Sequence, residues 1–266
     1  MTNIKQKELD LPDFLKQLLG KSFIYIPNPG NAGDALIMYG ALQLFDRLGL
    51  EYTIGDIKKI YTNELLILAG GGSLVGLYAH CKNFLLANKD SNYIVILPHT
   101  FKDEDALLKS LGDKCIIICR EKISYNYVHK IAKHKGNVYL SQDMAFYIDL
   151  DDRYKNAKAS TKTCNCFRGD KESTSVSIPQ DNNDISDTLK NNIWTKSYKE
   201  CKKTALRFFD YLANCDTIHT NRLHVAIAGS LLNKKVFLHN NSYYKNRAIY
   251  DYSLKDNPNV VFVKPQ

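Results

Sequence analysis

The sequence predicts an α/β protein built from two parallel β-sheets. Short apolar runs alternate with amphipathic segments along the 266-residue chain, and in those segments apolar residues recur every three or four positions, as in helices. The runs are apolar throughout, which is typical of parallel strands covered on both faces. A polar stretch after Leu150, DDRYKNAKAST, interrupts the alternation and predicts a link between two domains.

The first half has the pattern of a doubly wound domain, in which each strand is followed by a helix. Its strands are predicted at Phe23–Ile26, Leu65–Ala69, Tyr93–Leu97, Lys114–Cys119 and Asn137–Leu140. Its helices are predicted at Ala35–Leu48, Leu77–Ala87, Glu104–Leu111 and Glu121–Lys133.

The second half repeats this pattern on a smaller scale. Its strands are predicted at Thr163–Phe167, Thr217–His219, Lys235–Leu238 and Val260–Val263. Its helices are predicted at Ser197–Ala213, Arg222–Leu232 and Tyr244–Tyr250, with a loop or short helix over Asp181–Asn192. We therefore expect two Rossmann-like domains, residues 1–155 and 156–266, with ligands bound in a cleft at the carboxyl ends of both sheets.

Composition excludes several classes of protein. Hydrophobic residues make up 44% of the chain and charged residues 24%, as in globular proteins. No apolar run approaches the ~20 residues that cross a bilayer, and the start of the chain, MTNIKQKELDLPDF, lacks the apolar region of a signal peptide. A cytoplasmic location is expected. The seven cysteines lack the spacing of a zinc site, which predicts buried thiols in a reducing compartment and no metal.

Positive charge is concentrated in the second half of the chain. Residues 1–150 contain 17 basic and 16 acidic residues, whereas residues 151–266 contain 19 and 12, a balance of +7. This excess is consistent with an anionic substrate, nucleic acid or an anionic membrane surface. Because basic residues do not cluster with aromatic ones, no nucleic-acid partner is expected.

Two glycine-containing turns follow predicted strands of the first half. Gly30-Asn31-Ala32-Gly33-Asp34 opens a helix, where glycines let the backbone approach a ligand and free N–H groups attract anions. Asp34 also suits a simple helix cap. The second turn, AGGGSL at residues 69–74, indicates either close backbone packing or a ligand loop.

Basic residues stand at three further strand ends. Arg120 ends a buried strand, where it either pairs with an internal carboxylate or holds an anion. Arg222 and His224 lie at the start of a helix, a place that favours anions. Lys245 follows two tyrosines after another strand.

Taken in order, these motifs resemble the polysaccharide pyruvyl transferase family over nearly the whole chain. The resemblance rests on GNAGDALI at 30–37, AGGGSL at 69–74, PHTF at 98–101, CREKIS at 119–124, QDMAF at 142–146, CFRGDKES at 166–173, TNRLHVAIAG at 220–229 and YYKN at 243–246. It implies two Rossmann-like halves in a GT-B-like arrangement. It also implies transfer of the enolpyruvyl group of phosphoenolpyruvate to two sugar hydroxyls as a cyclic ketal.

The resemblance implies roles for individual residues. Catalysis would fall to His224, Arg120 and Asp34, and donor binding to Arg222, Lys245 and Arg120. The N-terminal domain would be the acceptor side and the C-terminal domain the donor side. The residues expected to bind the acceptor are Asn31, Gly33, Asp34, Gly71, Gly72, Ser73, His99 and Leu223.

The implied partners are phosphoenolpyruvate, as a co-substrate, and a sugar acceptor. That acceptor would be a lipid-linked saccharide or an oligosaccharide, a precursor of a bacterial surface or capsular polysaccharide. The scheme requires no cofactor and no metal. A lipid-linked acceptor and the basic second half together predict peripheral contact with the cytoplasmic face of the membrane.

Two other functions stay open. A GT-B-type glycosyltransferase with a nucleotide-sugar donor would share the architecture, but the E-x7-E pair of many such enzymes cannot be formed, since only Glu172 and Glu200 follow residue 121. The string Asp149-Leu150-Asp151 fits a metal-dependent transferase, but its polar surroundings favour a solvated surface. A non-catalytic glycan- or anion-binding module would bind phosphoenolpyruvate without releasing phosphate.

Overall fold

The computed structural model describes residues 5–155, 162–174, 177–190 and 193–264. The chain forms two compact units. The N-terminal unit consists of residues 1–28 and 40–147, and the C-terminal unit of residues 29–39 and 148–266. Each unit contains its own parallel sheet, so the predicted α/β class with two parallel sheets is confirmed.

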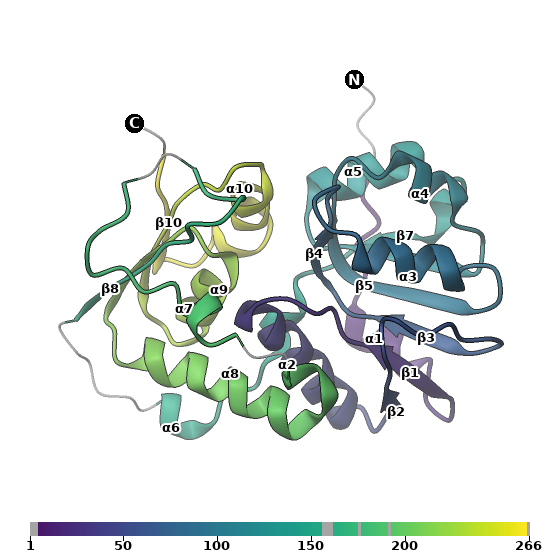
Figure 1. Ribbon diagram of the computed structural model, residues 1–266, viewed down its shortest axis with the longest axis horizontal. Helices are drawn as coiled ribbons and strands as arrows, with labels where there is room; N and C mark the ends of the chain where they lie inside the picture. The colour runs from purple at the N-terminus through teal and green to yellow at the C-terminus, as the bar shows by residue number, and fades with distance from the viewer. Residues whose placement is uncertain (1–4, 156–161, 175–176, 191–192, 265–266) are drawn as a thin grey trace. The chain divides into compact units, whose positions relative to one another are not determined.

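The N-terminal unit is built on a seven-stranded parallel sheet with the order β2-β1-β3-β5-β6-β7, in which β4 also pairs with β5. The helices α3, α4 and α5 cover one face of this sheet (Figure 1). Its strands are β1 (Ser22–Ile26), β2 (Glu51–Ile54), β3 (Leu65–Leu68), β4 (Gly71–Leu74), β5 (Tyr93–Phe101), β6 (Cys115–Cys119) and β7 (Val138–Leu140). Its helices are α1 (Leu11–Lys16), the part of α2 (Ala32–Arg47) from residue 40 onward, α3 (His80–Asn88), α4 (Asp105–Ser110) and α5 (Lys122–Ile131), with 3₁₀ turns at Lys135–Asn137 and Met144–Tyr147.

The second half of α2 packs on β1 through aromatic side chains. The ring of Phe45 lies 5.2 Å from that of Phe23 and 5.6 Å from that of Tyr25, both in edge-to-face geometry. All three side chains are almost fully buried. Such pairs bury large apolar areas and hold the second half of α2 against β1.

The C-terminal unit contains a four-stranded parallel sheet with the order β11-β10-β9-β8. Its strands are β8 (Thr163–Cys166), β9 (Thr217–Thr220), β10 (Lys235–Leu238) and β11 (Val260–Phe262). Its helices are α6 (Asp152–Lys155), α7 (Ile185–Thr188), α8 (Tyr198–Ala213), α9 (Leu223–Leu231) and α10 (Lys245–Ile249), with a 3₁₀ turn at Trp194–Lys196 and a π-helical turn at Tyr250–Leu254.

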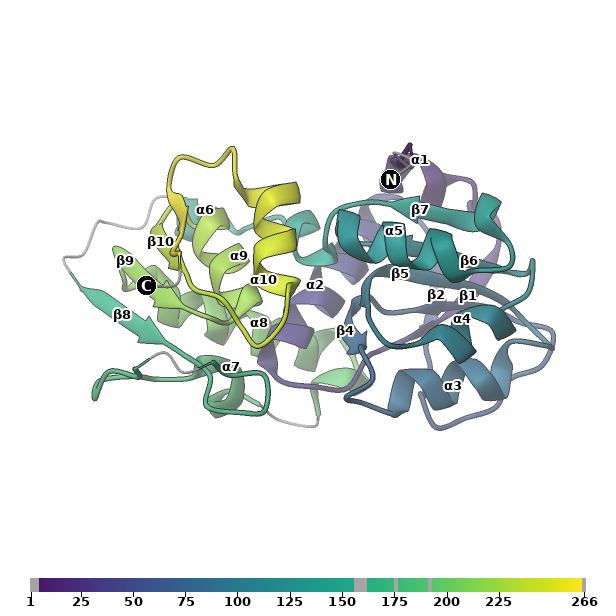
Figure 2. The same cartoon turned by 90° about the horizontal axis from the view of Figure 1, so that it is seen from above.

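The apolar helix α9 packs closely on this sheet (Figure 2). A Cβ atom built on Gly229 would lie only 2.8 Å from the side chain of Val236 and 2.9 Å from that of Ile218. A glycine is needed here because any larger residue would push the helix away from β9 and β10. The close contact fixes where α9 begins, and hence where Arg222 and His224 lie.

The units differ from the predicted domains in two places. Residues 29–39, at the start of α2, belong to the C-terminal unit: the Cys201 thiol donates to the Ala35 carbonyl at 3.3 Å. The first residues of the predicted link also belong to the C-terminal unit, because Tyr154 is buried there and donates to Asp210 at 2.7 Å. The remainder of the predicted link, residues 156–161, lies outside the described residues.

The interpretation of all seven cysteines as free thiols is wrong for two of them. Cys164 on β8 and Cys215, just after α8, form a disulfide that joins positions 51 residues apart. The remaining five cysteines are free and buried. The sequence offered no spacing motif for this pair because the two residues meet only when β8 lies beside β9.

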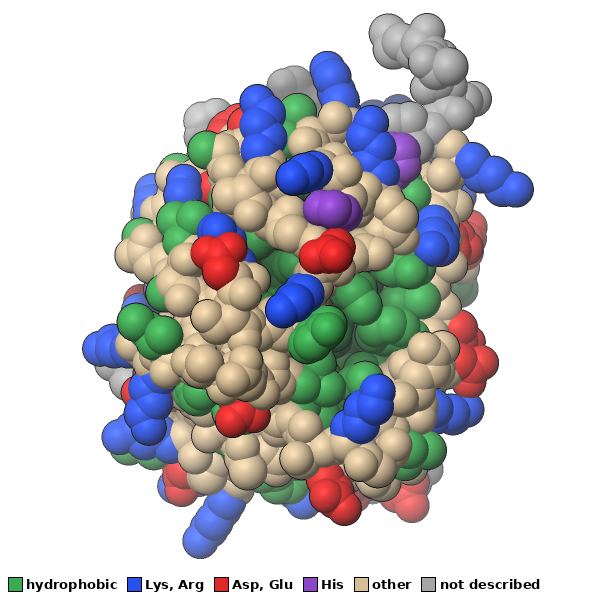
Figure 3. Space-filling model, turned by 90° about the vertical axis from the view of Figure 1, so that its right-hand side faces the viewer, with side chains coloured by type: hydrophobic (Ala, Val, Ile, Leu, Met, Phe, Trp, Pro, Cys, Tyr) green, Lys and Arg blue, Asp and Glu red, His purple; other side chains and the backbone are tan. Residues whose placement is uncertain are grey.

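The surface on the right-hand side of Figure 1 carries basic and acidic side chains in mixture, together with a hollow lined by hydrophobic side chains (Figure 3). The mixture agrees with the near-neutral balance of residues 1–150. Among the described residues, no helix has the length and apolar character needed to cross a membrane.

Candidate active site

Three basic side chains gather at the carboxyl edge of the sheet in the C-terminal unit. Arg168 follows β8, Arg222 follows β9, and Lys245 begins α10 after β10. Because these strands are parallel neighbours, the segments that follow them lie at the same edge. The three residues are only 3%, 5% and 7% exposed. We call Arg168, Arg222 and Lys245 the basic cluster.

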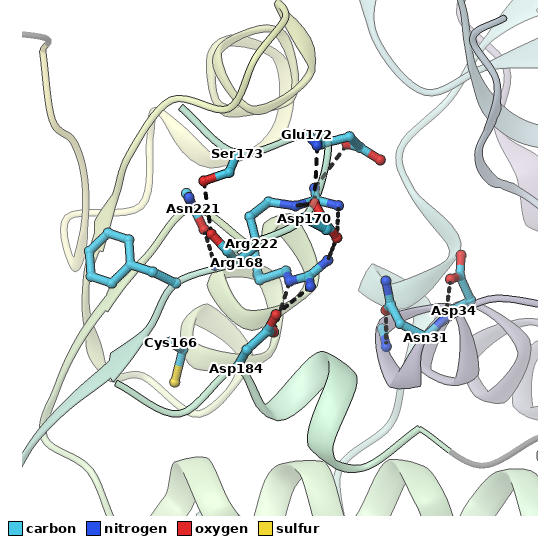
Figure 4. Close-up of polar contacts among 12 residues, drawn as sticks. Asn31, Asp34, Cys166, Arg168, Asp170, Glu172, Ser173, Asp184, Asn221 and Arg222 are labelled. Atoms are coloured by element: carbon cyan, nitrogen blue, oxygen red, sulfur yellow. Dashed lines mark hydrogen bonds and ion pairs between the residues drawn. The ribbon is translucent and has the colours of Figure 1, made fainter. Parts of the chain in front are cut away.

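Arg168 holds two carboxylates of its own loop (Figure 4). Its Nε and Nη2 donate to the two oxygens of Asp170 at 2.7 and 2.9 Å, and its Nη1 donates to Glu172 at 2.9 Å. Burial acts to raise the pKa of Asp170, but the hydrogen bonds and charge of Arg168, with the charge of Arg222, lower this pKa well below its ordinary value. Asp170 is therefore ionised at neutral pH and is gripped by both arms of the guanidinium.

Arg222 binds a second carboxylate in the same two-armed manner. Its Nε donates to Asp184 at 2.9 Å, its Nη2 donates to the other oxygen of that carboxylate, and its Nη1 lies 3.1 Å from Asp170. The residue caps α9, which starts one residue later at Leu223, and its backbone N–H donates to Thr220 Oγ1 at 2.9 Å. The strand end thus fixes the backbone of Arg222, while Asp184 fixes its side chain.

Lys245 completes the basic cluster. Its Nζ donates to Glu172 Oε2, which also accepts from Arg168. The same Nζ lies 5.2 Å from the centre of the Tyr243 ring. The three cations face three carboxylates, Asp170, Glu172 and Asp184, so their charges balance. Such an arrangement satisfies buried charges and presents several donors that suit oxyanions.

The start of α2 lies against His224 within the same unit. A Cβ atom built on Gly33 would lie 2.8 Å from Nδ1 of His224, so only glycine allows the backbone to approach this ring. Around it, Asn31 Oδ1 accepts from the Gly33 N–H at 2.8 Å, and Asp34 Oδ2 accepts from the Asn31 N–H at 3.0 Å. The turn that contains Asn31, Gly33 and Asp34 is thereby placed beside His224.

Arg120 lies in the N-terminal unit and is 1% exposed. Its Nη1 donates to Asp143 at 2.7 Å and its Nε donates to Thr100 Oγ1 at 2.8 Å. Asp143 is itself fully buried. Of the two interpretations of this strand-end arginine, the structure favours the internal ion pair.

His99 is also enclosed in the N-terminal unit. Its Nε2 accepts from the Ser73 N–H at 3.1 Å, and burial, aided by the charge of Arg120, lowers its pKa to about 3. The ring is therefore neutral at physiological pH and serves to hold the turn of Gly71, Gly72 and Ser73 in place. Gly71 has a φ of 140°, which only glycine adopts readily.

In the parts of the chain that the structure describes, no group of three or more His, Cys, Asp or Glu side chains could hold a metal ion.

Residues 31–243 match the family model of the polysaccharide pyruvyl transferases. The chain belongs to the polysaccharide pyruvyl transferase family. The predicted resemblance is confirmed.

Two relatives extend this assignment. A Bacillus subtilis (strain 168) protein named as a pyruvyl transferase, EpsO, is 25% identical over an alignment that covers 92% of this chain and 89% of that protein. An uncharacterised protein of Klebsiella pneumoniae subsp. pneumoniae NTUH-K2044, known from its crystal structure, is 34% identical with a TM-score of 0.86, and the match covers 100% of both chains. The second likeness supports the fold of each unit of this pyruvyl transferase family member.

The predicted site residues of this family member fall into two groups. Asn31, Gly33, Asp34, Arg222, Leu223, His224 and Lys245 belong to the C-terminal unit, and Gly71, Gly72, Ser73, His99 and Arg120 to the N-terminal unit. The residues at the start of α2 were predicted for the acceptor side in the N-terminal domain, yet they share a unit with the basic cluster.

Sequence reasoning missed four members of the ion network. Arg168, Asp170, Glu172 and Asp184 were absent from the predicted site, although CFRGDKES contributed to the family resemblance. A usable signal was present: Arg168 directly follows the predicted strand Thr163–Phe167, as Arg120 follows another predicted strand.

Proposed function

We propose that this member of the family transfers the enolpyruvyl group of phosphoenolpyruvate to two hydroxyls of a sugar in a polysaccharide precursor, forming a cyclic pyruvate ketal. The observation that carries the proposal is the basic cluster beside His224 at the carboxyl edge of one sheet. Phosphoenolpyruvate carries a carboxylate and a phosphate, and arginines bind both kinds of oxyanion through two parallel hydrogen bonds.

The reaction needs one proton donor and one proton acceptor. Protonation of the CH2 carbon of phosphoenolpyruvate makes C2 electrophilic, and a sugar hydroxyl attacks C2 and loses its proton. The bond from C2 to the phosphate oxygen then breaks, and a second hydroxyl attacks C2 to close the ring. Of the two protons that the hydroxyls release, one balances the proton gained by the methyl group and the other leaves with phosphate.

The arginines of the basic cluster already hold carboxylates in the geometry that a donor would use. Arg168 and Arg222 each bind one carboxylate through Nε and Nη2. Since the three cations are balanced by three carboxylates, we expect the donor to displace a carboxylate when it binds. Asp184 is the candidate for displacement. Its side chain is 18% exposed and pairs with Arg222, whereas Glu172 is 4% exposed, and Asp170, although 41% exposed, is held by both Arg168 and Arg222.

His224 is the proposed proton carrier. It lies two residues after Arg222 on α9, next to the Gly33 backbone, and histidine exchanges protons near neutral pH. Asp34 accepts a hydrogen bond from the Asn31 N–H and orients the turn beside His224. The proposed acceptor is a lipid-linked saccharide or an oligosaccharide.

The proposal is tested by incubating the purified chain with phosphoenolpyruvate and a panel of lipid-linked and free oligosaccharides. We expect phosphate release that depends on the acceptor, and a product whose mass exceeds that of the acceptor by one pyruvate ketal. Arg222→Ala is expected to weaken donor binding by about 2–5 kcal/mol. Arg247→Ala is the control, because Arg247 is half-exposed and pairs with Asp251 outside the cluster.

Each other outcome has a distinct meaning. Release of a nucleoside diphosphate from a nucleotide-sugar, without turnover of phosphoenolpyruvate, would instead indicate a glycosyltransferase. Binding of phosphoenolpyruvate without phosphate release across the panel would indicate a binding module. Equal donor affinity in the wild type and in Arg222→Ala would contradict the assigned donor site.

A further inference from the structure

The basic cluster is assembled beyond the ends of the strands that carry it. The last paired residues at this edge are Cys166 on β8, Thr220 on β9 and Leu238 on β10. Arg168 and Arg222 come two residues after their strands, and Lys245 comes seven residues after its strand. Since strand pairing stops short of all three cations, other contacts must set their spacing.

Two buried asparagines supply contacts that bridge these segments. Asn221 Oδ1 accepts a hydrogen bond from the backbone N–H of Arg168 at 2.7 Å. Asn246 Nδ2 donates to the carbonyl of Asn221 at 2.7 Å and to that of His239 at 2.9 Å. Asn221 is 1% exposed and Asn246 is fully buried.

The two asparagines lie next to cations of the basic cluster in the sequence, and each binds the backbone of another segment. Asn221 precedes Arg222 and binds the backbone of Arg168, while Asn246 follows Lys245 and binds the backbone of Asn221. The two amides therefore connect the three cation-bearing segments in one line. Buried amides that use their donors and acceptors in this way hold backbone segments rigidly, because breaking such a bond leaves a buried polar group unpaired.

We propose that Asn221 and Asn246 are positioning residues that fix the spacing of Arg168, Arg222 and Lys245 for the phosphoenolpyruvate donor. The inference rests on the proposed function for the identity of the donor, but not for the geometry. Neither asparagine is assigned a contact with substrate. Their role is to keep the three cations at a separation that one carboxylate and one phosphate can span.

The matched control for Asn246 is Asn92 of the N-terminal unit. Asn92 is 1% exposed, and its Nδ2 donates to the carbonyls of Tyr61 at 2.8 Å and Asn88 at 2.9 Å. Replacing Asn246 by alanine removes its two side-chain hydrogen bonds, and replacing Asn92 removes two comparable ones together with the bond that its Oδ1 accepts from the Glu64 N–H at 3.0 Å. The Asn92 variant should therefore lose at least as much thermal stability as the Asn246 variant, and only the Asn246 variant should lose donor affinity.

The experiment compares wild type, Asn221→Ala, Asn246→Ala and Asn92→Ala by calorimetric titration with phosphoenolpyruvate and by crystallography. We expect at least tenfold weaker binding for Asn221→Ala and Asn246→Ala, unchanged binding for Asn92→Ala, and loss of the Lys245–Glu172 contact in crystals of Asn246→Ala. In a Lys245→Met background, which lacks the ammonium group, adding Asn246→Ala should weaken binding much less than it does in the wild type.

Two results would overturn the inference: unchanged donor affinity in both site variants, or equal weakening in Asn92→Ala. If the wild type binds no phosphoenolpyruvate, the proposed function fails, and the crystal structures alone decide this inference. In that case an undisturbed Lys245 in Asn246→Ala crystals contradicts the positioning role, and a displaced Lys245 supports it. In crystals of Asn221→Ala, a displaced Arg168 likewise supports the positioning role, and an undisturbed Arg168 contradicts it.

Discussion

At the scale of single residues, burial decides which arginine is available to a ligand. Asp143, which holds Arg120, is fully buried, whereas the side chain of Asp184, which holds Arg222, is 18% exposed. Releasing a carboxylate that water already reaches costs less free energy than leaving a buried one unpaired. Arg222 is therefore the better place for an incoming anion, and Arg120 holds together the end of its own sheet.

His224 gives the sharpest prediction at this scale. His224→Ala should lower kcat by roughly 10²–10⁴-fold, the range for loss of a general acid–base group, and should leave the melting temperature nearly unchanged. His224→Gln should also stay slow, because glutamine restores hydrogen bonding but transfers no proton. Turnover and melting temperature are measured together for both variants. Near-normal turnover with a lowered melting temperature would instead show that His224 is only a packing residue.

The lowered pKa of His99 predicts how the stability of the folded chain depends on pH. Burial lowers its pKa to about 3 in the folded chain, whereas the unfolded chain has an ordinary histidine pKa of about 6.5. Between these values the unfolded state binds the extra proton, so stability falls as the pH drops from about 6.5 toward 3. The contribution of one proton is at most about 1.4 kcal/mol per pH unit.

Denaturant unfolding at a series of pH values measures this effect. His99→Gln, which cannot titrate, should lose less stability than the wild type between pH 7 and pH 5. The comparison is made as a difference because burial also lowers the pKa values of His219 and His239. Parallel pH curves for the two proteins would show that His99 does not resist protonation.

At the scale of secondary-structure elements, the sequence best predicts those strands and helices that have a strong local pattern of apolar residues. The fully apolar strand β3 and the strongly amphipathic helix α8 were both expected close to their observed bounds. The strands β2 and β4 were missed: β2 is a half-exposed edge strand, and β4 is half glycine. Neither has the apolar run that predicts a buried strand.

The remaining misses depend on contacts between distant residues. The start of α2 was assigned to the unit of the strand before it, and its contact with Cys201 lies 166 positions away. The link of Arg222 to Asp184 spans 38 positions and that of Lys245 to Glu172 spans 73. No spacing in the sequence encodes such pairs, so Arg222 and Lys245 were predicted while their carboxylates Asp184 and Glu172 were missed.

The disulfide between β8 and the end of α8 gives a prediction at this scale. Closing a loop of 51 residues is expected to stabilise the fold by about 4 kcal/mol, mainly by restricting the unfolded chain. Reductant should lower the melting temperature of the wild type to that of a Cys164→Ala/Cys215→Ala double variant, which should not respond to reductant. Cys81→Ala is the control for loss of a buried free thiol. A wild-type melting temperature that is indifferent to reductant would contradict the disulfide.

At the scale of the whole molecule, charge is distributed unequally along the chain. The excess of +7 lies in residues 151–266, and in the described structure the cations of the basic cluster are balanced by their own carboxylates. Much of the excess is therefore carried by other basic residues, such as the exposed Lys202 and Lys203 of α8. Exposed lysines attract anionic surfaces weakly and at short range.

This excess predicts salt-dependent association with anionic lipid, in keeping with a lipid-linked acceptor. The chain should co-sediment with vesicles that contain phosphatidylglycerol at low salt and dissociate as salt rises, because screening shortens the range of the attraction. Vesicles of phosphatidylcholine alone are the control. Absence of association at low salt, with full activity on free sugars, would contradict the predicted contact with the membrane.

The basic cluster of the C-terminal unit is the proposed binding site of the donor. The most direct measurement is a crystal structure of the chain with phosphoenolpyruvate, or with an analogue whose phosphate is replaced by a non-hydrolysable phosphonate. We expect the anion to contact Arg168, Arg222 and Lys245 at the carboxyl edge of the four-stranded sheet, with Asp184 displaced from Arg222. A donor bound instead at the Gly71–Ser73 turn, with the ion network of the basic cluster intact, would contradict it.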